Sequence, residues 1–189
     1  MDRQGVYMRR VFTGITAAAL AALTVPAMAA DGAAQGSPHP IANPALASLV
    51  DEYWAAVLAD APVFASSLGE RAHDGKVEDY SLAGADRQAA AAAAFLRRLD
   101  AIDLADLSAP DRVNHGILRR SLQEVIEANG FGQRAMNFTN RSGWHQSFAG
   151  MADNLPFKVK GDYESYNARL AQFGRVNAQA IAVANDAIK

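Results

Sequence analysis

Four histidines are the side chains of this sequence best suited to metal binding or proton transfer: His39, His73, His115 and His145. They lie in four separate segments. None has a second histidine four residues away with a glutamate between them, the spacing that places two zinc ligands on one face of a helix. Cysteine is absent, which excludes thiolate nucleophiles, Cys-ligated zinc and disulfides. The residues alone therefore predict no catalytic, cofactor-binding or metal site in this chain.

Two pairs of neighbouring polar residues are weaker candidates for a functional site. Arg97 and Arg98 could contact an anion, but two arginines in the last turn of a helix are explained more simply by the helix dipole. His73 and Asp74 could be neighbours in a site, but the Gly that follows them favours a solvated turn in a surface connection.

The stretch 131–161 is rich in aromatic residues and glycines. Trp144 and His145 lie within it and could line a substrate cleft, because clefts combine aromatic walls with few polar groups. The alternative is a long connection whose aromatic side chains pin it onto the core. Trp144, Phe148 and Met151 would share one face of a short helix in either case.

Composition excludes several classes of protein. Half of the 189 residues are hydrophobic, enough for one domain with a sizeable core, and the formal net charge is −2. The pattern shows no basic patch of the kind that nucleic acid binding requires. No Gly-rich loop follows a strand, so nucleotide binding has no support either.

The first residues are predicted to be a signal peptide. Arg9 and Arg10 precede an apolar run over 11–25, and the small residues of 27–29 suggest cleavage before Ala30. The apolar run is short for a membrane span, so stable membrane insertion is not expected. The sequence predicts export, most simply to a bacterial periplasm.

The sequence therefore divides into three parts: a signal peptide at 1–29, a flexible leader at 30–42 that contains His39, and a helical domain at 43–189. The leader is small, polar and proline-bearing, as linkers are.

The stretch 43–69 predicts a long helix that ends before Pro62 and is followed by the short segment Val63–Leu68. Asn43 can cap its first turn, Pro44 suits the first helical position, Pro62 disfavours helical geometry at the preceding residue, and Gly69 can close the segment in a left-handed conformation. Its apolar residues recur at steps of three and four: Leu46, Leu49, Val50, Tyr53, Trp54, Val57 and Leu58.

Two further helices should form an antiparallel hairpin. The first runs to Asp100 and is expected to start near Asp86; the second is capped by Ser108 and stops at Asn129 and Gly130. The predicted buried face of the second helix consists of Val113, Ile117, Leu118, Leu122, Val125 and Ile126. His115 falls near the edge of that stripe and is expected to be a partly buried packing residue.

A last helix is predicted over 162–188, with Asp162 as its cap. Its expected apolar stripe is Tyr163, Tyr166, Leu170, Phe173, Ile181 and Ile188. The pattern breaks off at Lys189 without a stop signal, which suggests a chain that continues. The fold class expected is all-α, with antiparallel helical hairpins and one long aromatic-rich connection.

Several short motifs resemble, in their order and spacing, the N-terminal part of the exported bacterial family known as domain of unknown function 885. They are Tyr53-Trp54, Pro62, Ser67-Leu68-Gly69, Asp79-Tyr80-Ser81, Leu99-Asp100-Ala101-Ile102-Asp103, Asp111-Arg112, Ile117-Leu118, Leu122, Asp162-Tyr163-Glu164-Ser165-Tyr166 and Arg169-Leu170. The resemblance covers most of residues 43–189.

The resemblance implies a larger helical, zincin-like fold of which this chain would be the N-terminal portion. Full-length members are similar to zinc metallopeptidases, and their metal motif, a His-Glu pair followed by Pro-Gly-His, lies far downstream. Zinc is therefore expected only in a missing C-terminal part, and no ligand or catalytic residue carries over. The expected partners are that C-terminal half and, in the full-length protein, a peptide substrate.

Two functional hypotheses remain open at this point. The first is an N-terminal scaffold of an exported metallopeptidase-like hydrolase, inactive alone. The second is a stand-alone periplasmic helical protein that binds a peptide, a ligand or another protein.

Overall fold

The structure, a computed structural model, describes residues 41–136, 139 and 143–188. The predicted signal peptide, His39 and most of the predicted leader lie outside these residues, as does Ser142, which the sequence suggests as the cap of the short helix that holds Trp144. The helices, in chain order, are α2 (Pro44–Asp60), α3 (Pro62–Ser67), α4 (Leu82–Asp100), α5 (Ala109–Gly130), α6 (Trp144–Ala149), α7 (Lys160–Leu170) and α8 (Phe173–Ala187). The short 3₁₀ turns are η1 (Arg71–His73), η2 (Leu104–Asp106), η3 (Gln133–Ala135) and η4 (Gly150–Asn154). No strand occurs in the described part of the chain, so the all-α prediction is confirmed.

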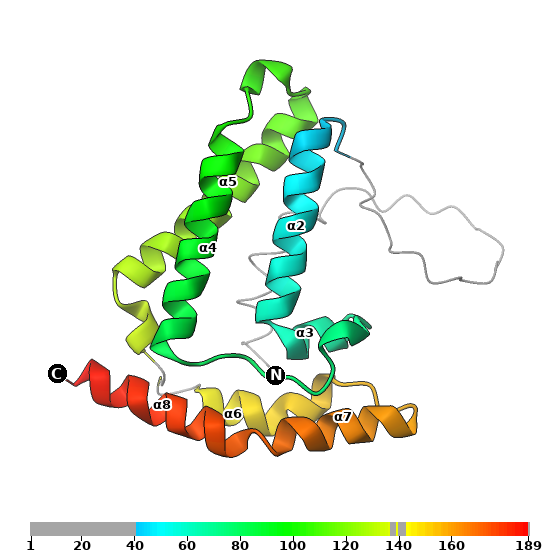
Figure 1. The fold of residues 1–189 in the computed structure, drawn as a ribbon, viewed down its shortest axis with the longest axis vertical. Helices are drawn as coiled ribbons and strands as arrows, with labels where there is room; N and C mark the ends of the chain where they lie inside the picture. Colours follow the sequence, from blue (N-terminus) through cyan, green and yellow to red (C-terminus); the bar gives the residue numbers. More distant parts are fainter. Residues whose placement is uncertain (1–40, 137–138, 140–142, 189) are drawn as a thin grey trace.

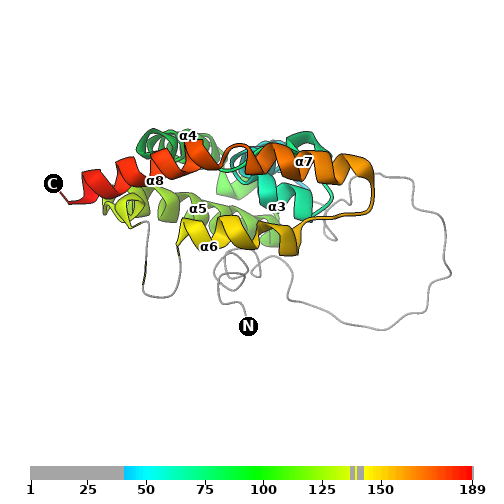
Figure 2. The ribbon, with the colours of Figure 1, turned by 90° about the horizontal axis from the view of Figure 1, so that it is seen from below.

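The helices form a three-helix bundle that stands on a helical base (Figure 1). The long helices α2, α4 and α5 make the bundle. Below it, α6, α7 and α8 make the base, and α7 and α8 run one after the other along it (Figure 2). The short helix α3 lies between bundle and base, directly after α2.

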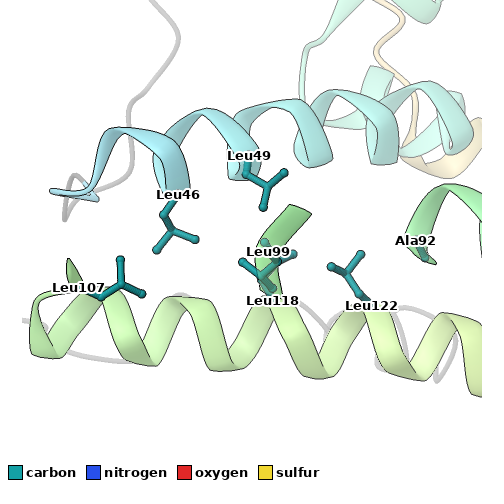
Figure 3. Close-up of a cluster of buried hydrophobic side chains, with 7 residues drawn as sticks. All are labelled: Leu46, Leu49, Ala92, Leu99, Leu107, Leu118 and Leu122. Atoms are coloured by element: carbon teal, nitrogen blue, oxygen red, sulfur yellow. The ribbon is translucent and has the colours of Figure 1, made fainter. Parts of the chain in front are cut away.

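A cluster of leucines fills the centre of the bundle, where side chains of α2 face those of α4 and α5 (Figure 3). We call it the bundle core; it consists of Leu46, Leu49, Ala92, Leu99, Leu107, Leu118 and Leu122. Alanine at position 92 permits close approach of neighbouring helices, because a methyl group is the whole side chain. The predicted antiparallel pairing of α4 with α5 is confirmed.

The start of α2 agrees with the prediction and is reinforced by a distant residue. Asn43 accepts a hydrogen bond from the Leu46 amide at 3.0 Å, which satisfies a donor of the first turn. The buried Asp111 carboxylate accepts from the amides of Ala42 and Asn43 at 3.2 and 3.1 Å. Ile41 packs against the bundle core. The last residues assigned to the leader are therefore fixed to the bundle.

The first helix of the hairpin begins earlier than predicted. Ser81 caps it by accepting from the Gly84 amide at 3.0 Å, so α4 starts at Leu82 rather than near Asp86. Gly84 lies inside the first turn of α4, and a Cβ atom at this position would lie 2.8 Å from Asp79 Cγ.

The prediction of the buried face of α5 is only partly right. Leu118 and Leu122 are buried as expected, but Val113 is 61% exposed and Val125 also faces solvent. Two polar residues, Asp111 and His115, occupy the buried face instead. The apolar pattern could not show this, because both are buried by hydrogen bonds with other segments.

A second cluster holds the base together. This base core consists of Val77, Phe148, Met151 and Val176, with Val63, Tyr80, Trp144, Leu155 and Tyr166 packed against it. The predicted short helix with Trp144, Phe148 and Met151 on one face is confirmed as α6 and η4. These aromatic side chains pack inside the base, as the second interpretation of the stretch 131–161 expected.

The single last helix predicted over 162–188 is wrong in two respects. The chain forms α7 and α8, interrupted at residues 171–172. Most of the predicted stripe is exposed: Tyr163, Leu170, Phe173, Ile181 and Ile188. The buried positions are instead Asp162, Arg169, Val176, Ala180 and Val183. The reason is that two charged residues of α7 find partners inside the protein, and this turns the larger apolar side chains outward.

Candidate functional site

Several interacting polar side chains of the described residues surround Arg169 of α7. Its side chain is only 2% exposed. Nε donates to the carbonyl of Lys76 at 2.8 Å, and one terminal nitrogen donates to Ser66 Oγ at 2.6 Å and to the carbonyl of Pro62 at 3.3 Å. One guanidinium thus joins α7 to α3 and to the segment between η1 and α4.

Three charged side chains extend this arrangement. Asp74 accepts from Ser66 Oγ at 2.5 Å and from Arg71 Nε at 2.7 Å. Arg71 also contacts the buried carboxylate of Asp162 at 2.5 Å. We call the five residues Ser66, Arg71, Asp74, Asp162 and Arg169 the Arg169 cluster. It connects residues that are up to about a hundred positions apart in the chain.

Local backbone geometry places these side chains. Asp162 lies in the first turn of α7 and accepts from the amides of Lys158 and Val159 at 2.7 and 3.1 Å. It therefore caps the helix from within its first turn, not from the preceding position as predicted. Gly75 has φ +79°, which suits glycine, and its carbonyl accepts from Gln172 at 2.6 Å.

The surroundings shift the protonation equilibria of the cluster and its neighbours. Burial lowers the pKa of the Arg169 guanidinium and raises the pKa of the nearby Glu78 carboxyl. Hydrogen bonds from the Lys158 and Val159 amides, together with Arg71, hold the pKa of Asp162 below its usual range. Burial therefore disfavours the charged forms of Arg169 and Glu78, whereas direct hydrogen bonds favour the ionised form of Asp162.

The chemistry available to the Arg169 cluster is structural. The buried Ser66 hydroxyl donates to Asp74 and accepts from Arg169, so its lone pairs and proton are used internally. The guanidinium of Arg169 is out of reach of a substrate. A buried ionic arrangement of this kind fixes geometry, because removing one partner leaves the other charge buried and unpaired.

A second polar junction lies where the segment after η1 meets α4 and α8. Asp79 accepts from the Ser81 hydroxyl at 2.7 Å, from Arg87 at 2.9 Å and from the Gln179 amide at 2.8 Å. Burial alone would raise the pKa of Asp79, but the hydrogen bonds from Ser81 and Arg87 outweigh it and lower the pKa to about 2. We call Asp79 with Ser81, Arg87 and Gln179 the Asp79 junction.

The histidines considered from the sequence lie in separate places. His73 is half-buried in η1, and the exposed His145 has its ring against Trp144. His115 is more deeply buried than predicted, and its Nε2 lies 3.1 Å from the carbonyl oxygen of Leu99. Within the described ranges, no three residues of the types His, Cys, Asp and Glu are grouped so as to hold a metal ion.

The two polar pairs that the sequence suggested as weaker candidate sites have structural roles in the fold. Arg98 pairs with Glu52 of α2, with nitrogen–oxygen distances of 2.7 and 2.9 Å, and Arg97 lies exposed beside it in the last turn of α4. Asp74 belongs to the Arg169 cluster, so the segment after η1 is not the solvated connection expected. No helix of the described residues is long and apolar enough to cross a membrane.

Sequence reasoning missed the Arg169 cluster, although a signal was present. Asp162, Arg169, Val176 and Val183 are spaced by seven residues, which places them on one side of a continuing helical path. Because the charged residues Asp162 and Arg169 recur at the same spacing as Val176 and Val183, the pattern indicates that the two charged side chains are buried in a polar contact. The spacing does not reveal the partners, since Ser66 and Arg71 come from a different part of the chain.

Two comparisons with known proteins bear on function. The family described as bacterial protein of unknown function (DUF885) matches residues 62–189. The match includes every helix from α3 onward, and α2 precedes it. No curated protein matches this chain.

Proposed function

This chain belongs to the DUF885 family of bacterial proteins of unknown function, and from that premise we propose that it is the N-terminal helical scaffold of an exported metallopeptidase-like hydrolase. In this proposal residues 43–189 are inactive alone, and zinc binding and catalysis belong to a further C-terminal part of the polypeptide. Its substrate would be a peptide.

One observation carries this proposal: α7 and α8 leave large apolar side chains in solvent. Ile181 is 53% exposed and Ile188 is 83% exposed, and Tyr163, Leu170 and Phe173 are also exposed. Single exposed apolar residues are ordinary, but several on two consecutive helices favour a surface that other polypeptide covers. The Arg169 cluster would hold these helices at a fixed position for that contact.

The proposal is tested on the protein isolated from the periplasm of its native host. We expect an intact mass well above the 20.1 kDa of this chain and hydrolysis of a peptide library that a zinc chelator abolishes. A mature mass that corresponds to residues 30–189 alone, with no hydrolysis, would contradict it.

A paired substitution tests the surface itself. Ile181→Asp should lower the peptidase activity of the full-length protein, because a charge would replace a buried apolar contact. Val113→Asp, at a similarly exposed valine on α5, is the matched control and should leave activity unchanged. Equal effects of the two changes would count against a covered surface on α8.

A second function, a stand-alone periplasmic binding protein, is favoured by one different observation. The described chain contains two clusters of fully or nearly buried apolar residues, so it carries cores of its own. Under this hypothesis residues 30–189 would be a monomer that unfolds cooperatively and stays monomeric at high concentration. Sedimentation at several concentrations separates this outcome from association through exposed α7 and α8.

A further inference from the structure

Glu78 is a half-buried carboxyl group that belongs neither to the Arg169 cluster nor to the Asp79 junction. It lies in the segment between η1 and α4, directly after the buried Val77. Its Oε1 accepts a hydrogen bond from the Val63 amide of α3 at 3.3 Å. The positive charge of Arg169 on α7 acts on it and favours its ionised form. Glu78 therefore lies where α3, α7 and this segment meet.

The charges in this region do not balance. The Arg169 cluster contains two arginines, Arg71 and Arg169, and two carboxylates, Asp74 and Asp162. Glu78 adds a third carboxylate and no cation. Two positive and three negative charges leave a net charge of −1 when all five groups are ionised. An excess charge inside a protein costs free energy, because low-dielectric surroundings replace water.

The elements packed around Glu78 supply no further cation for it within the described residues. Helix α3 has no ionisable side chain. Lys76 is exposed, and the neighbouring Asp79 already takes Arg87 of α4 as its partner. Tyr80 packs against the base core, where burial and the charge of Glu78 both raise the pKa of its hydroxyl, so it stays neutral. Arg169 is the cation that acts on Glu78, and its Nη2 also lies 3.9 Å from an oxygen of Asp74.

The three carboxylates are not equally supplied with hydrogen bonds. Asp162 accepts from two backbone amides and from Arg71. Asp74 accepts from a serine hydroxyl and from the same arginine. Glu78 accepts from the Val63 amide at 3.3 Å, a long distance for an N–H···O hydrogen bond. Burial raises the pKa of Glu78, whereas hydrogen bonds lower that of Asp162.

We propose that Glu78 is a proton-binding site beside the Arg169 cluster: the folded chain takes up a proton there as the solution becomes mildly acidic, and it gains stability by doing so. The proton removes the excess negative charge, while Asp162 stays ionised and keeps its contact with Arg71. This inference does not depend on the proposed peptidase function.

Carbon-13 NMR of the side-chain carboxyl groups of the whole chain measures this titration directly. Glu78→Gln identifies the Glu78 signal and keeps an oxygen for the Val63 amide. We expect the midpoint of the Glu78 titration to lie above 4.5, the ordinary value for a glutamate. A midpoint at or below 4.5 would overturn the proposal.

A second variant tests whether the charge imbalance is the cause. Asp74→Asn removes one negative charge and leaves Arg169 with a single carboxylate on that side, so the Glu78 midpoint should move to lower pH. Asp103→Asn, at the exposed cap of η2 in the bundle, is the matched control and should leave the midpoint where it is. No movement in Asp74→Asn, or the same movement in both variants, would contradict the assigned cause.

Chemical denaturation at several pH values tests the effect on stability. A carboxyl group whose pKa is higher in the folded than in the unfolded chain stabilises the fold when protonated, and this contribution is lost as the pH rises through the folded pKa. Wild type should therefore gain stability relative to Glu78→Gln as the pH falls from neutral to 4.5. A difference that does not change with pH over this range would show that Glu78 takes up no proton on folding.

Discussion

Arg169 donates a hydrogen bond to the hydroxyl oxygen of Ser66 across a distance of 2.6 Å, although the two residues are 103 positions apart in the chain. The contact joins α7 to α3, and the same guanidinium binds two backbone carbonyls. A buried guanidinium is tolerated only when nearly all of its donors are paired. The helices of the base are therefore fixed as much by this polar contact as by apolar packing.

Replacement of Arg169 by methionine should strongly destabilise the chain. The change leaves the Lys76 carbonyl and Ser66 without their buried donor and removes the positive charge 3.9 Å from Asp74. We expect a loss of about 3 kcal/mol or more in the free energy of unfolding. Chemical denaturation measures it. Arg98→Met, which breaks an exposed pair with Glu52, is the control and should have a much smaller effect. Similar losses in the two variants would mean that the burial of Arg169 has no special role.

Removal of the Asp111 carboxylate should release the start of α2. In Asp111→Ala the amides of Ala42 and Asn43 lose their acceptor, and we expect a loss of about 2 kcal/mol of stability. Limited proteolysis should also cut the chain near residue 42 more quickly. Asp103→Ala, at an exposed cap of η2, is the comparison and should leave that site protected. Unchanged proteolysis near residue 42 in Asp111→Ala would contradict this role.

Two glycines in helices should respond to alanine in opposite directions. At Gly84 a Cβ atom would lie 2.8 Å from Asp79 Cγ and 3.0 Å from its carbonyl oxygen, so Gly84→Ala should destabilise by about 1–3 kcal/mol. At Gly116 in α5 nothing lies within 4 Å of the added atom. Gly116→Ala should therefore stabilise by about 0.5–1 kcal/mol, because alanine restricts the unfolded chain. Thermal denaturation of both variants tests the pair, and a shift of the same sign in both would refute the prediction.

Acid should weaken the Asp79 junction in a defined range. The pKa of Asp79 falls from 3.8 to about 2 in the folded protein. Its ionised form therefore contributes stability that is complete above the unfolded pKa and is lost as the pH falls through about 2. The stability difference between wild type and Asp79→Asn should be constant above about pH 5 and should shrink as the pH falls toward about 2. Unfolding free energies over this range check it, and a difference independent of pH would count against the assigned pKa.

The sequence by itself determined the helical class and several boundaries. The caps Asn43 and Ser108 start α2 and α5 where the sequence predicts, because a cap satisfies amides only two or three residues away. The leucines of α2 and α5 identified the bundle core, since their helical spacing places them on one face. Such interactions are local and can be predicted without the fold.

Only the tertiary structure decided which face of the last helices is buried. The spacing of Tyr163, Leu170, Ile181 and Ile188 indicated a different face from the one observed. Arg169 and Asp162 are buried because Ser66, Lys76 and Arg71 meet them in space. The seven-residue spacing of Asp162, Arg169, Val176 and Val183 is present in the sequence, but it does not reveal partners about a hundred residues away. The free energy of burying a charge depends on such partners, so apolar spacing alone predicted the wrong face.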